Sequence, residues 1–117
     1  MIIKNKNIFH LQGKHVSYIM AVNECGDLLH YYYGKKLRDR SYEWVKQKWS
    51  VWNGYGPDKW TLDICPQEYP AYGYTDLRTP AYSIVNKNGG TVSRLTYKSH
   101  RITENSAQEI DGMPCLF

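Results

Sequence analysis

Four acidic residues in the middle of the chain are the first candidates for acid–base chemistry. They are Asp58, Asp63, Glu68 and Asp76. Hydrolysis by a carboxylate pair with a covalent intermediate needs the two groups about 5 to 5.5 Å apart. Nothing in the spacing pairs these four, and a structural ion pair or turn contact with Arg78 fits Glu68 and Asp76 better. The sequence therefore predicts no catalytic residue in this chain.

Metal, cofactor and thiol chemistry find no support in the pattern either. The histidines lie on different expected strands, and a metal would need them to converge with acids or thiols: His10, His15, His30 and His100. The cysteines form no C-x-x-C pair, which excludes a zinc ribbon: Cys25, Cys65 and Cys115. Gly89-Gly90 precedes an expected strand, so it is no phosphate loop. We expect neither a metal nor a cofactor.

The composition indicates a globular domain with many aromatic residues. Hydrophobic residues make up 42% and charged residues 22%, which argues against disorder. The 11 Tyr and 4 Trp outnumber the 2 Phe, a balance that suits half-buried sheet faces, interfaces or sugar platforms. The net charge of +4 is interrupted by acids, as at Asp39 within the basic run 35–40. That run fits a solvated loop, so we expect no nucleic-acid partner.

The sequence contains no recognisable signal for secretion and no membrane-spanning segment. An odd number of dispersed thiols is typical of a reducing compartment. The residues after Met1 contain no apolar stretch long enough for a secretory signal, and no run reaches the length of a membrane span. We expect a cytoplasmic protein with no membrane partner.

Period-two alternation dominates the first third of the chain. Residues 8–12 form a short apolar-rich segment, and in 15–22 the odd-numbered and even-numbered side chains point to opposite faces. The turn sequence 23–27 is followed by a return strand over 28–33, and Gly34 ends the unit. An antiparallel hairpin over 16–33 follows from this pattern.

The rest of the chain combines a long loop, a proline-rich segment and a second hairpin. Residues 35–60 are expected to be a loop rich in Trp, and prolines exclude a central strand over 66–80. Strands are expected over 82–86 and 91–103, joined by an Asn/Gly turn, with a bulge between Val92 and Leu95. The fold class expected is all-β, an antiparallel β-sandwich. The apolar end without a closing element suggests a truncated domain.

The segment 66–82, Pro-Gln-Glu-Tyr-Pro-Ala-Tyr-Gly-Tyr-Thr-Asp-Leu-Arg-Thr-Pro-Ala-Tyr, carries the most specific signal. It resembles the Q-E-Y-P-x-x-G-x-x-D-[FLY]-R-x-P-A signature of glycoside hydrolase family 36 α-galactosidases, the type that cleaves raffinose and melibiose. The matching positions are Gln67, Glu68, Tyr69, Pro70, Gly73, Asp76, Arg78, Pro80 and Ala81. Further family-like motifs flank it in order: Tyr31 with Gly34-Lys35, Asn88-Gly89, Tyr97-Lys-Ser-His-Arg-Ile102 and Ile110-Asp-Gly-Met-Pro114.

The resemblance implies that residues 1–117 are the N-terminal part of a β-sandwich domain. Family members add a (β/α)₈ barrel, whose two aspartates are the nucleophile and the acid/base, and a C-terminal β domain. No position here matches those aspartates, so the chain alone is expected to be inactive. The tail also departs from the family, since 104–108 replaces its Gly-Lys-Pro.

The resemblance further implies a role for the loop between the Gly-Lys turn and the signature. In tetrameric members this loop reaches a neighbouring subunit's active site, often with an Asp that closes the galactose pocket. Residues 46–49, Lys-Gln-Lys-Trp, stand about there, so the role of that Asp does not carry over. The loop residues expected near substrate are Trp44, Lys48, Trp49, Trp52, Asp58 and Lys59. The Trp residues, with Trp60, fit a satellite hydrophobic cluster equally well.

Two functions follow. The favoured one is a non-catalytic segment of a retaining α-galactosidase that assists oligomerisation and closure of the active site, with the α-galactoside bound by the parent enzyme. The alternative is a stand-alone carbohydrate-binding module. For the signature itself we expect an architectural role, because its prolines stiffen the backbone and Asp76 and Arg78 lie two apart on one side of an extended chain.

Overall fold

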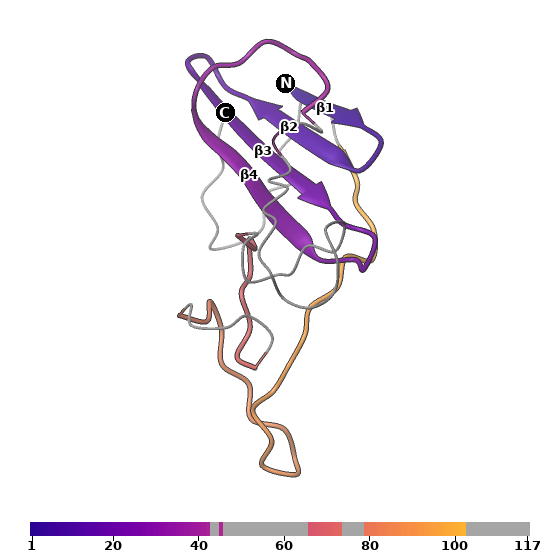
Figure 1. Cartoon of the computed structure of the whole chain (residues 1–117), viewed down its shortest axis with the longest axis vertical. Helices are drawn as coiled ribbons and strands as arrows, with labels where there is room; N and C mark the ends of the chain where they lie inside the picture. The colour runs from indigo at the N-terminus through magenta and orange to yellow at the C-terminus, as the bar shows by residue number, and fades with distance from the viewer. Residues whose placement is uncertain (43–44, 46–65, 74–78, 103–117) are drawn as a thin grey trace, which may run out of the picture.

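The structure is a computed structural model that describes residues 1–42, 45, 66–73 and 79–102. Its described part contains one antiparallel sheet whose strands are adjacent in chain order (Figure 1). The strands are β1 (Ile2–Asn5), β2 (Ile8–Gln12), β3 (Val16–Val22) and β4 (Leu28–Lys35). The expected all-β, antiparallel class is confirmed.

The alternation predicted for 15–22 determines which face of the sheet is buried. Ser17, Ile19 and Ala21 are almost fully buried, whereas the side chains between them are only partly so. Their cross-strand neighbours include His10 opposite Ile19 and Leu29 opposite Ala21, both buried as well. We call the side of the sheet that carries these buried residues the inner face. It forms the main core of the described structure.

The segment after β4 crosses the inner face and is held there by side chains of the sheet. The Leu37 N–H donates to Ser17 Oγ at 2.9 Å, and Gln12 Nε2 donates to the Leu37 carbonyl at 3.0 Å. Ser17 Oγ also lies 2.8 Å from His10 Nε2, and the ring of Tyr42 meets the His10 ring edge-on. This crossing accounts for a hydroxyl and an imidazole in an otherwise apolar core.

The turns follow the expected chemistry. In the turn 23–27 between β3 and β4, Gly26 has φ 84°, a value that side-chain-bearing residues rarely adopt. The Asn23 side chain accepts a hydrogen bond from the Asp27 N–H at 2.7 Å and donates to the Asp27 carboxylate at 2.9 Å. The predicted hairpin over 16–33 is confirmed, and β4 continues past Gly34 to Lys35.

Two features of the sheet differ from the sequence prediction. The first strand, β1, lies in a segment for which no strand was expected, and it pairs with β2 from Ile2 to Asn5. The irregularity in the ladder lies in β4: Ile19 pairs with Tyr32 and Met20 with His30, which leaves Tyr31 as the extra residue. A bulge at this position changes which face the remaining β4 side chains occupy.

The predicted second hairpin forms only its turn. The Asn86 N–H bonds the Gly90 carbonyl at 2.9 Å, and Gly89 has φ 79°. Yet no residue in 83–86 or 91–102 belongs to a strand or a β-bridge, so the predicted strands 82–86 and 91–103 and the bulge between Val92 and Leu95 are wrong. High β-propensity reflects packing against a neighbouring strand, and neither limb of this hairpin has one among the described residues.

Candidate functional site: the signature segment on the edge of the sheet

The first half of the signature lies along the free edge of β4. The His30 N–H donates to the Pro66 carbonyl at 2.8 Å, and the Glu68 N–H donates to the Leu28 carbonyl at 3.0 Å. These two bonds make an antiparallel bridge between Leu29 and Gln67. The pairing stops there because prolines before and after the bridge have no N–H to donate. The segment is thus a short cap on the sheet edge.

Glu68 fixes this cap to the outer face of the sheet. One carboxylate oxygen accepts a hydrogen bond from the Tyr18 hydroxyl, and the other lies 3.0 Å from Nδ1 of His30. The Glu68 side chain is only 13% exposed, so the two partners replace most of its hydration. Burial raises the pKa of Tyr18, and the hydrogen bond to Glu68 raises it further, because ionised tyrosine would face the carboxylate.

The second half of the signature turns back over itself. The Ala81 N–H donates to the Pro70 carbonyl at 2.8 Å, next to a parallel bridge between Ala71 and Tyr82. Gly73 has φ 79°, as expected of the predicted turn. A Cβ atom there would lie 2.8 Å from Cγ2 of Val92, so Gly73 also permits close approach of the second hairpin.

A second polar anchor joins the β3–β4 turn to the descending limb of that hairpin. The Arg94 guanidinium binds the Asp27 carboxylate through Nε at 3.1 Å and through Nη2 at 3.0 Å, and also reaches the Cys25 carbonyl. Asp27 is almost completely buried. Three residues later the Tyr97 N–H donates to the Gly26 carbonyl at 2.7 Å. The hairpin is therefore attached to the sheet at its root.

The limb 97–102 closes a shallow apolar groove over the outer face of the sheet. The groove has a volume of about 270 Å³ and lies between this limb and residues such as Phe9 and Met20. The ring of His100 meets the Phe9 ring edge-on with centroids 4.9 Å apart, and the Tyr97 hydroxyl is hydrogen-bonded to His100. Few polar groups line the groove, so it suits apolar side chains better than a sugar.

The described residues of the signature lie along the edge of the sheet and at the start of the second hairpin. Gln67, Glu68 and Pro70 contact the sheet or the hairpin, Tyr69 is 60% exposed, and Pro80 is exposed. Asp76 and Arg78 lie outside the described residues. So do all the loop residues expected near substrate: Trp44, Lys48, Trp49, Trp52, Asp58 and Lys59.

The partners of the two acidic anchors were not identified from the sequence. Glu68 meets Tyr18 and His30, which lie 50 and 38 positions away, rather than the Arg78 considered for it. Arg94 lies 67 positions from Asp27. The turn 23–27 did contain one signal, because Asn23, Gly26 and Asp27 are residue types whose side chains or backbone form hydrogen bonds within a turn. Nothing local indicates which cation or donor will reach it.

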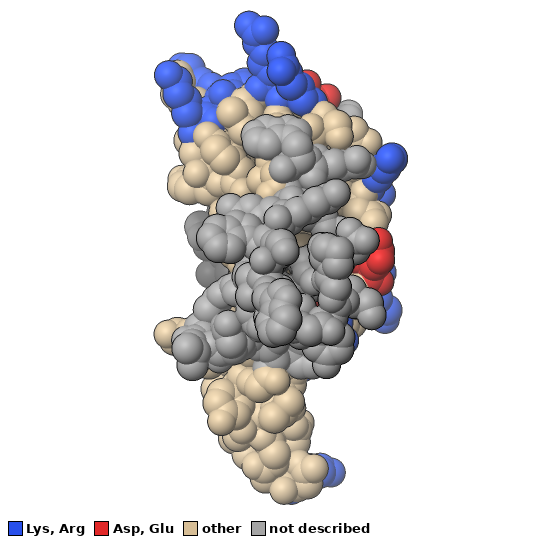
Figure 2. Space-filling view, in the orientation of Figure 1, with Lys and Arg blue, Asp and Glu red and all other residues tan. Residues whose placement is uncertain are grey.

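Two of the described acids, Glu68 and Asp27, are engaged in structural contacts. Both oxygens of Glu68 and of Asp27 have protein partners. Across 1–42, 66–73 and 79–102, no three His, Cys, Asp or Glu side chains lie close enough to hold a metal ion. No helix in those ranges is long and apolar enough to span a membrane. Figure 2 shows several basic side chains gathered at the upper end of the molecule with acidic atoms beside them, and further basic side chains along one side and at the opposite tip.

Comparison with known proteins gives one consistent result. The family model for the glycosyl hydrolase family 36 N-terminal domain matches residues 26–117. The chain is 38% identical over 113 residues to α-galactosidase AgaA of Geobacillus stearothermophilus, covering 93% of this chain but 15% of AgaA. It is 37% identical to the bifunctional α-galactosidase/sucrose kinase AgaSK of Mediterraneibacter gnavus, covering 97% of this chain and 12% of that protein.

Solved structures agree with the sequence matches. The galactosidase domain of AgaSK superposes with a TM-score of 0.70 at 36% identity, covering 85% of this chain and 15% of that one. A variant of AgaA in complex with raffinose superposes with a TM-score of 0.66 at 41% identity, covering 80% of this chain and 14% of that one. The chain thus spans about 15% of the length of these relatives. With the sheet, the signature and these matches together, the chain belongs to the glycosyl hydrolase family 36 N-terminal domain family.

Proposed function

We propose that this chain is the non-catalytic N-terminal segment of a retaining α-galactosidase that hydrolyses terminal α-galactosides such as melibiose and raffinose. In this role it assists oligomerisation and closure of the active site. The relatives' names and the raffinose bound to an AgaA variant support the substrate class. We also propose that the parent enzyme is a cytoplasmic homo-oligomer, which the dispersed cysteines and the family resemblance support.

The observation that carries the non-catalytic role is the engagement of Glu68. It is the acid of the signature, and both of its oxygens have protein partners, Tyr18 and His30. A catalytic carboxylate must reach the reacting atoms, and one of a retaining pair must have its partner about 5 Å away. Asp27 is likewise held by Arg94 and Asn23. These acids serve the fold.

The test is hydrolysis of an aryl α-galactoside by the purified chain. We expect no turnover above the uncatalysed rate, and since enzymes accelerate reactions at least about a millionfold, even weak catalysis would be visible. Turnover that survives purification and is lost in Glu68→Gln or Asp27→Asn would overturn the proposal. In the parent enzyme, the same proposal predicts a concentration-dependent oligomer whose activity falls when the subunits dissociate.

A stand-alone carbohydrate-binding module is the second candidate. The observation in its favour is the exposure of Tyr33, Tyr69 and Tyr72, since tyrosine rings stack on sugars. Calorimetric titration of the chain with raffinose separates the two functions. Saturable binding that weakens in Tyr33→Ala or Tyr69→Ala supports a module, whereas the segment function predicts no heat of binding.

A further inference from the structure

Residues 36–42, which we call the strap, are held on the inner face of the sheet by a small number of contacts. The Leu37 backbone is bonded on both sides, because its N–H donates to Ser17 Oγ and its carbonyl accepts from Gln12 Nε2. Tyr42 is buried, whereas most other residues of the strap are exposed. A segment with few buried contacts can open at a lower free energy than the whole fold needs. The strap is therefore a candidate for local opening.

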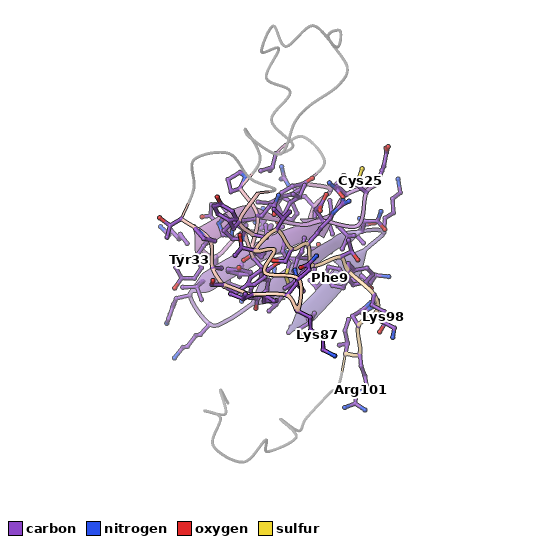
Figure 3. The ribbon with its side chains drawn as sticks, turned by 90° about the horizontal axis from the view of Figure 1, so that it is seen from below. Phe9, Cys25, Tyr33, Lys87, Lys98 and Arg101 are labelled. Atoms are coloured by element: carbon purple, nitrogen blue, oxygen red, sulfur yellow. The ribbon has the colours of Figure 1, made fainter. Side chains whose placement is uncertain are left out.

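A buried histidine lies beneath the strap. His10 is only 2% exposed, its Nε2 atom lies 2.8 Å from Ser17 Oγ, and the Tyr42 ring meets its ring edge-on. The preceding residue, Phe9, lies on the opposite side of the sheet, against the second hairpin (Figure 3). Because His10 faces the strap, water reaches its ring most directly when the strap moves aside.

The hydrogen bonds around Ser17 favour a neutral His10. Ser17 Oγ accepts the Leu37 N–H, and its hydroxyl has one proton to donate. Nε2 of His10 is placed to accept that proton, which it can do only when it carries no proton itself. The other ring nitrogen, Nδ1, is buried without a hydrogen-bond partner among the described residues. The closed strap therefore fits the neutral ring.

Protonation of His10 places a charge where the closed strap does not solvate it. Both ring nitrogens are then donors, so the Ser17 hydroxyl loses its acceptor and Nδ1 still lacks one. A buried cation without compensating hydrogen bonds is costly, and the cost disappears when the ring reaches water. Opening of the strap relieves both problems at once.

The charged groups that act on His10 belong to the strap. Burial is the largest effect and lowers the pKa of His10 below 6.5, Asp39 raises it, and Lys36 lowers it. The residues paired with His10 on β1 and β3 are both isoleucines, so the neighbouring strands add no charge at these positions. The Tyr42 hydroxyl keeps its proton, because burial raises its pKa above 10. Of the two rings that meet beneath the strap, only that of His10 gains a charge between pH 8 and pH 5.

The free energy of opening the strap therefore depends on pH. With the strap open, the His10 ring lies in water, where histidine takes up a proton near pH 6.5. With the strap closed, burial delays this uptake to a lower pH. The free energy of opening is thus constant well above pH 6.5 and falls as the pH drops through that value.

We propose that residues 36–42 are a pH-sensitive strap, which leaves the inner face when His10 takes up a proton while the sheet itself stays folded. The proposal goes beyond the function proposed above and does not depend on it. His10 and Ser17 form the switch, and Leu37 and Tyr42 make the contacts that are lost.

Hydrogen exchange of the full 117-residue chain tests the proposal, with the Leu37 amide as the reporter. Its protection factor should fall at least about fivefold between pH 8 and pH 5, since about thirtyfold is available to a histidine that titrates only in the open form. Low urea should leave this exchange unchanged, because local opening exposes little surface.

The Val22 N–H, which donates to the Asn7 carbonyl at 2.8 Å, is the reference for opening of the sheet. Its exchange should accelerate with urea, because opening of the sheet exposes much more surface. Protection at Leu37 that does not change with pH, or that follows urea as Val22 does, overturns the proposal.

Two variants separate the switch from the ordinary contacts of the strap. His10→Asn cannot take up a proton, so the protection factor of Leu37 should be equal at pH 8 and pH 5. Tyr42→Phe keeps the ring against His10 but removes the hydroxyl that donates to the Arg38 carbonyl. It should lower protection to the same extent at both pH values and leave their ratio as in the unsubstituted chain. An unchanged ratio in His10→Asn overturns the proposal.

A pair of charge variants tests the same switch where His10→Asn does not fold. Asp39→Asn removes the charge that favours protonated His10 in the closed strap, so the fall in Leu37 protection from pH 8 to pH 5 should become larger. Lys36→Gln removes a charge that disfavours it, so the fall should become smaller. Both side chains are exposed, so the difference should be clearest at low salt. Equal falls in the two variants contradict the proposal.

Discussion

Glu68 illustrates how one side chain joins two parts of the molecule that are distant in sequence. A carboxylate that leaves water loses several kcal/mol of hydration, which strong hydrogen bonds must replace. Tyr18 and His30 supply them from two adjacent strands, while the Glu68 backbone pairs with β4. Glu68 therefore stabilises the contact between the signature and the sheet by acting as a hydrogen-bond acceptor.

Glu68→Gln should destabilise the chain. The amide keeps the shape but removes the charge and turns one acceptor into a donor that faces Tyr18 or His30. The loss should be about 1.5–3 kcal/mol, measured by urea unfolding. Glu24→Gln removes the same charge from an exposed position of the β3–β4 turn and should change stability by less than about 0.5 kcal/mol. Equal effects would mean that the Glu68 contacts contribute nothing specific.

Gly73 and Gly89 allow a second comparison, because both have φ 79° but different surroundings. Alanine at either position should cost about 1–2 kcal/mol for the left-handed backbone. At Gly73 the added methyl group also meets Val92, whereas nothing lies within 4 Å at Gly89. Gly73→Ala should thus cost about 1–3 kcal/mol more in thermal unfolding. If Val92→Ala does not relieve this excess, the close approach of the second hairpin is not its cause.

His10 should make the chain sensitive to acid. Burial lowers its pKa below 6.5, with Lys36 acting in the same direction and Asp39 opposing both. The folded chain then holds His10 neutral while the unfolded chain takes up a proton, so stability is lost as the pH falls through 6.5. Between pH 8 and pH 5, the urea concentration at the unfolding midpoint should fall less steeply for His10→Asn than for the unsubstituted chain.

At the scale of elements, local sequence patterns correctly predicted the structural features that depend on residues close together in the chain. Alternation identified β3, and Gly26, Gly73 and Gly89 identified turns, because both signals arise within a few residues. The strand β1 was missed because its sequence, Ile-Ile-Lys-Asn, is short and does not alternate. Strands were predicted over 82–86 and 91–103 from the content of Val, Tyr and Thr. This content indicates that a segment suits a β-sheet, but it does not indicate whether a partner strand is present.

The root of the second hairpin depends on a bidentate contact, so Arg94→Lys should loosen it although the charge is kept. Lysine lacks the planar fork that binds both oxygens of Asp27. We expect a loss of about 1–2 kcal/mol, because the arginine is about one-third exposed, and faster hydrogen exchange at the Tyr97 amide that bonds Gly26. Lys98→Arg, a change on the same limb, is the control. Unchanged exchange at Tyr97 in Arg94→Lys would contradict this account of the root.

At the scale of the whole molecule, the described part is an open sheet from which the second hairpin extends (Figure 1). Within residues 1–42, 66–73 and 79–102, no strand pairs with the outer edge of β1, so this edge of the sheet is free. The opposite edge, on β4, is covered only by the single bridge between Leu29 and Gln67. Open edges recruit other strands, so the isolated chain should self-associate. Static light scattering should show a mass that rises with concentration, and Ile2→Lys, which places a charge on β1, should reduce the rise. A single monomeric species at high concentration would contradict the expectation.

The order of the strands has a consequence for how the chain assembles. Every ladder joins neighbours along the chain, with pairs as close as Asn5 and Ile8, so the sheet closes only small loops and should form early. The fastenings at Glu68 and Arg94 close loops of 50 and 67 residues and must form later. During synthesis, at about 5–20 residues per second, β4 is complete on the order of seconds before Arg94 emerges. For that interval the new sheet has an uncapped edge on a translating ribosome. The basic residues at the end of β4 and just after it, Lys35, Lys36, Arg38 and Arg40, add charge repulsion between two such edges.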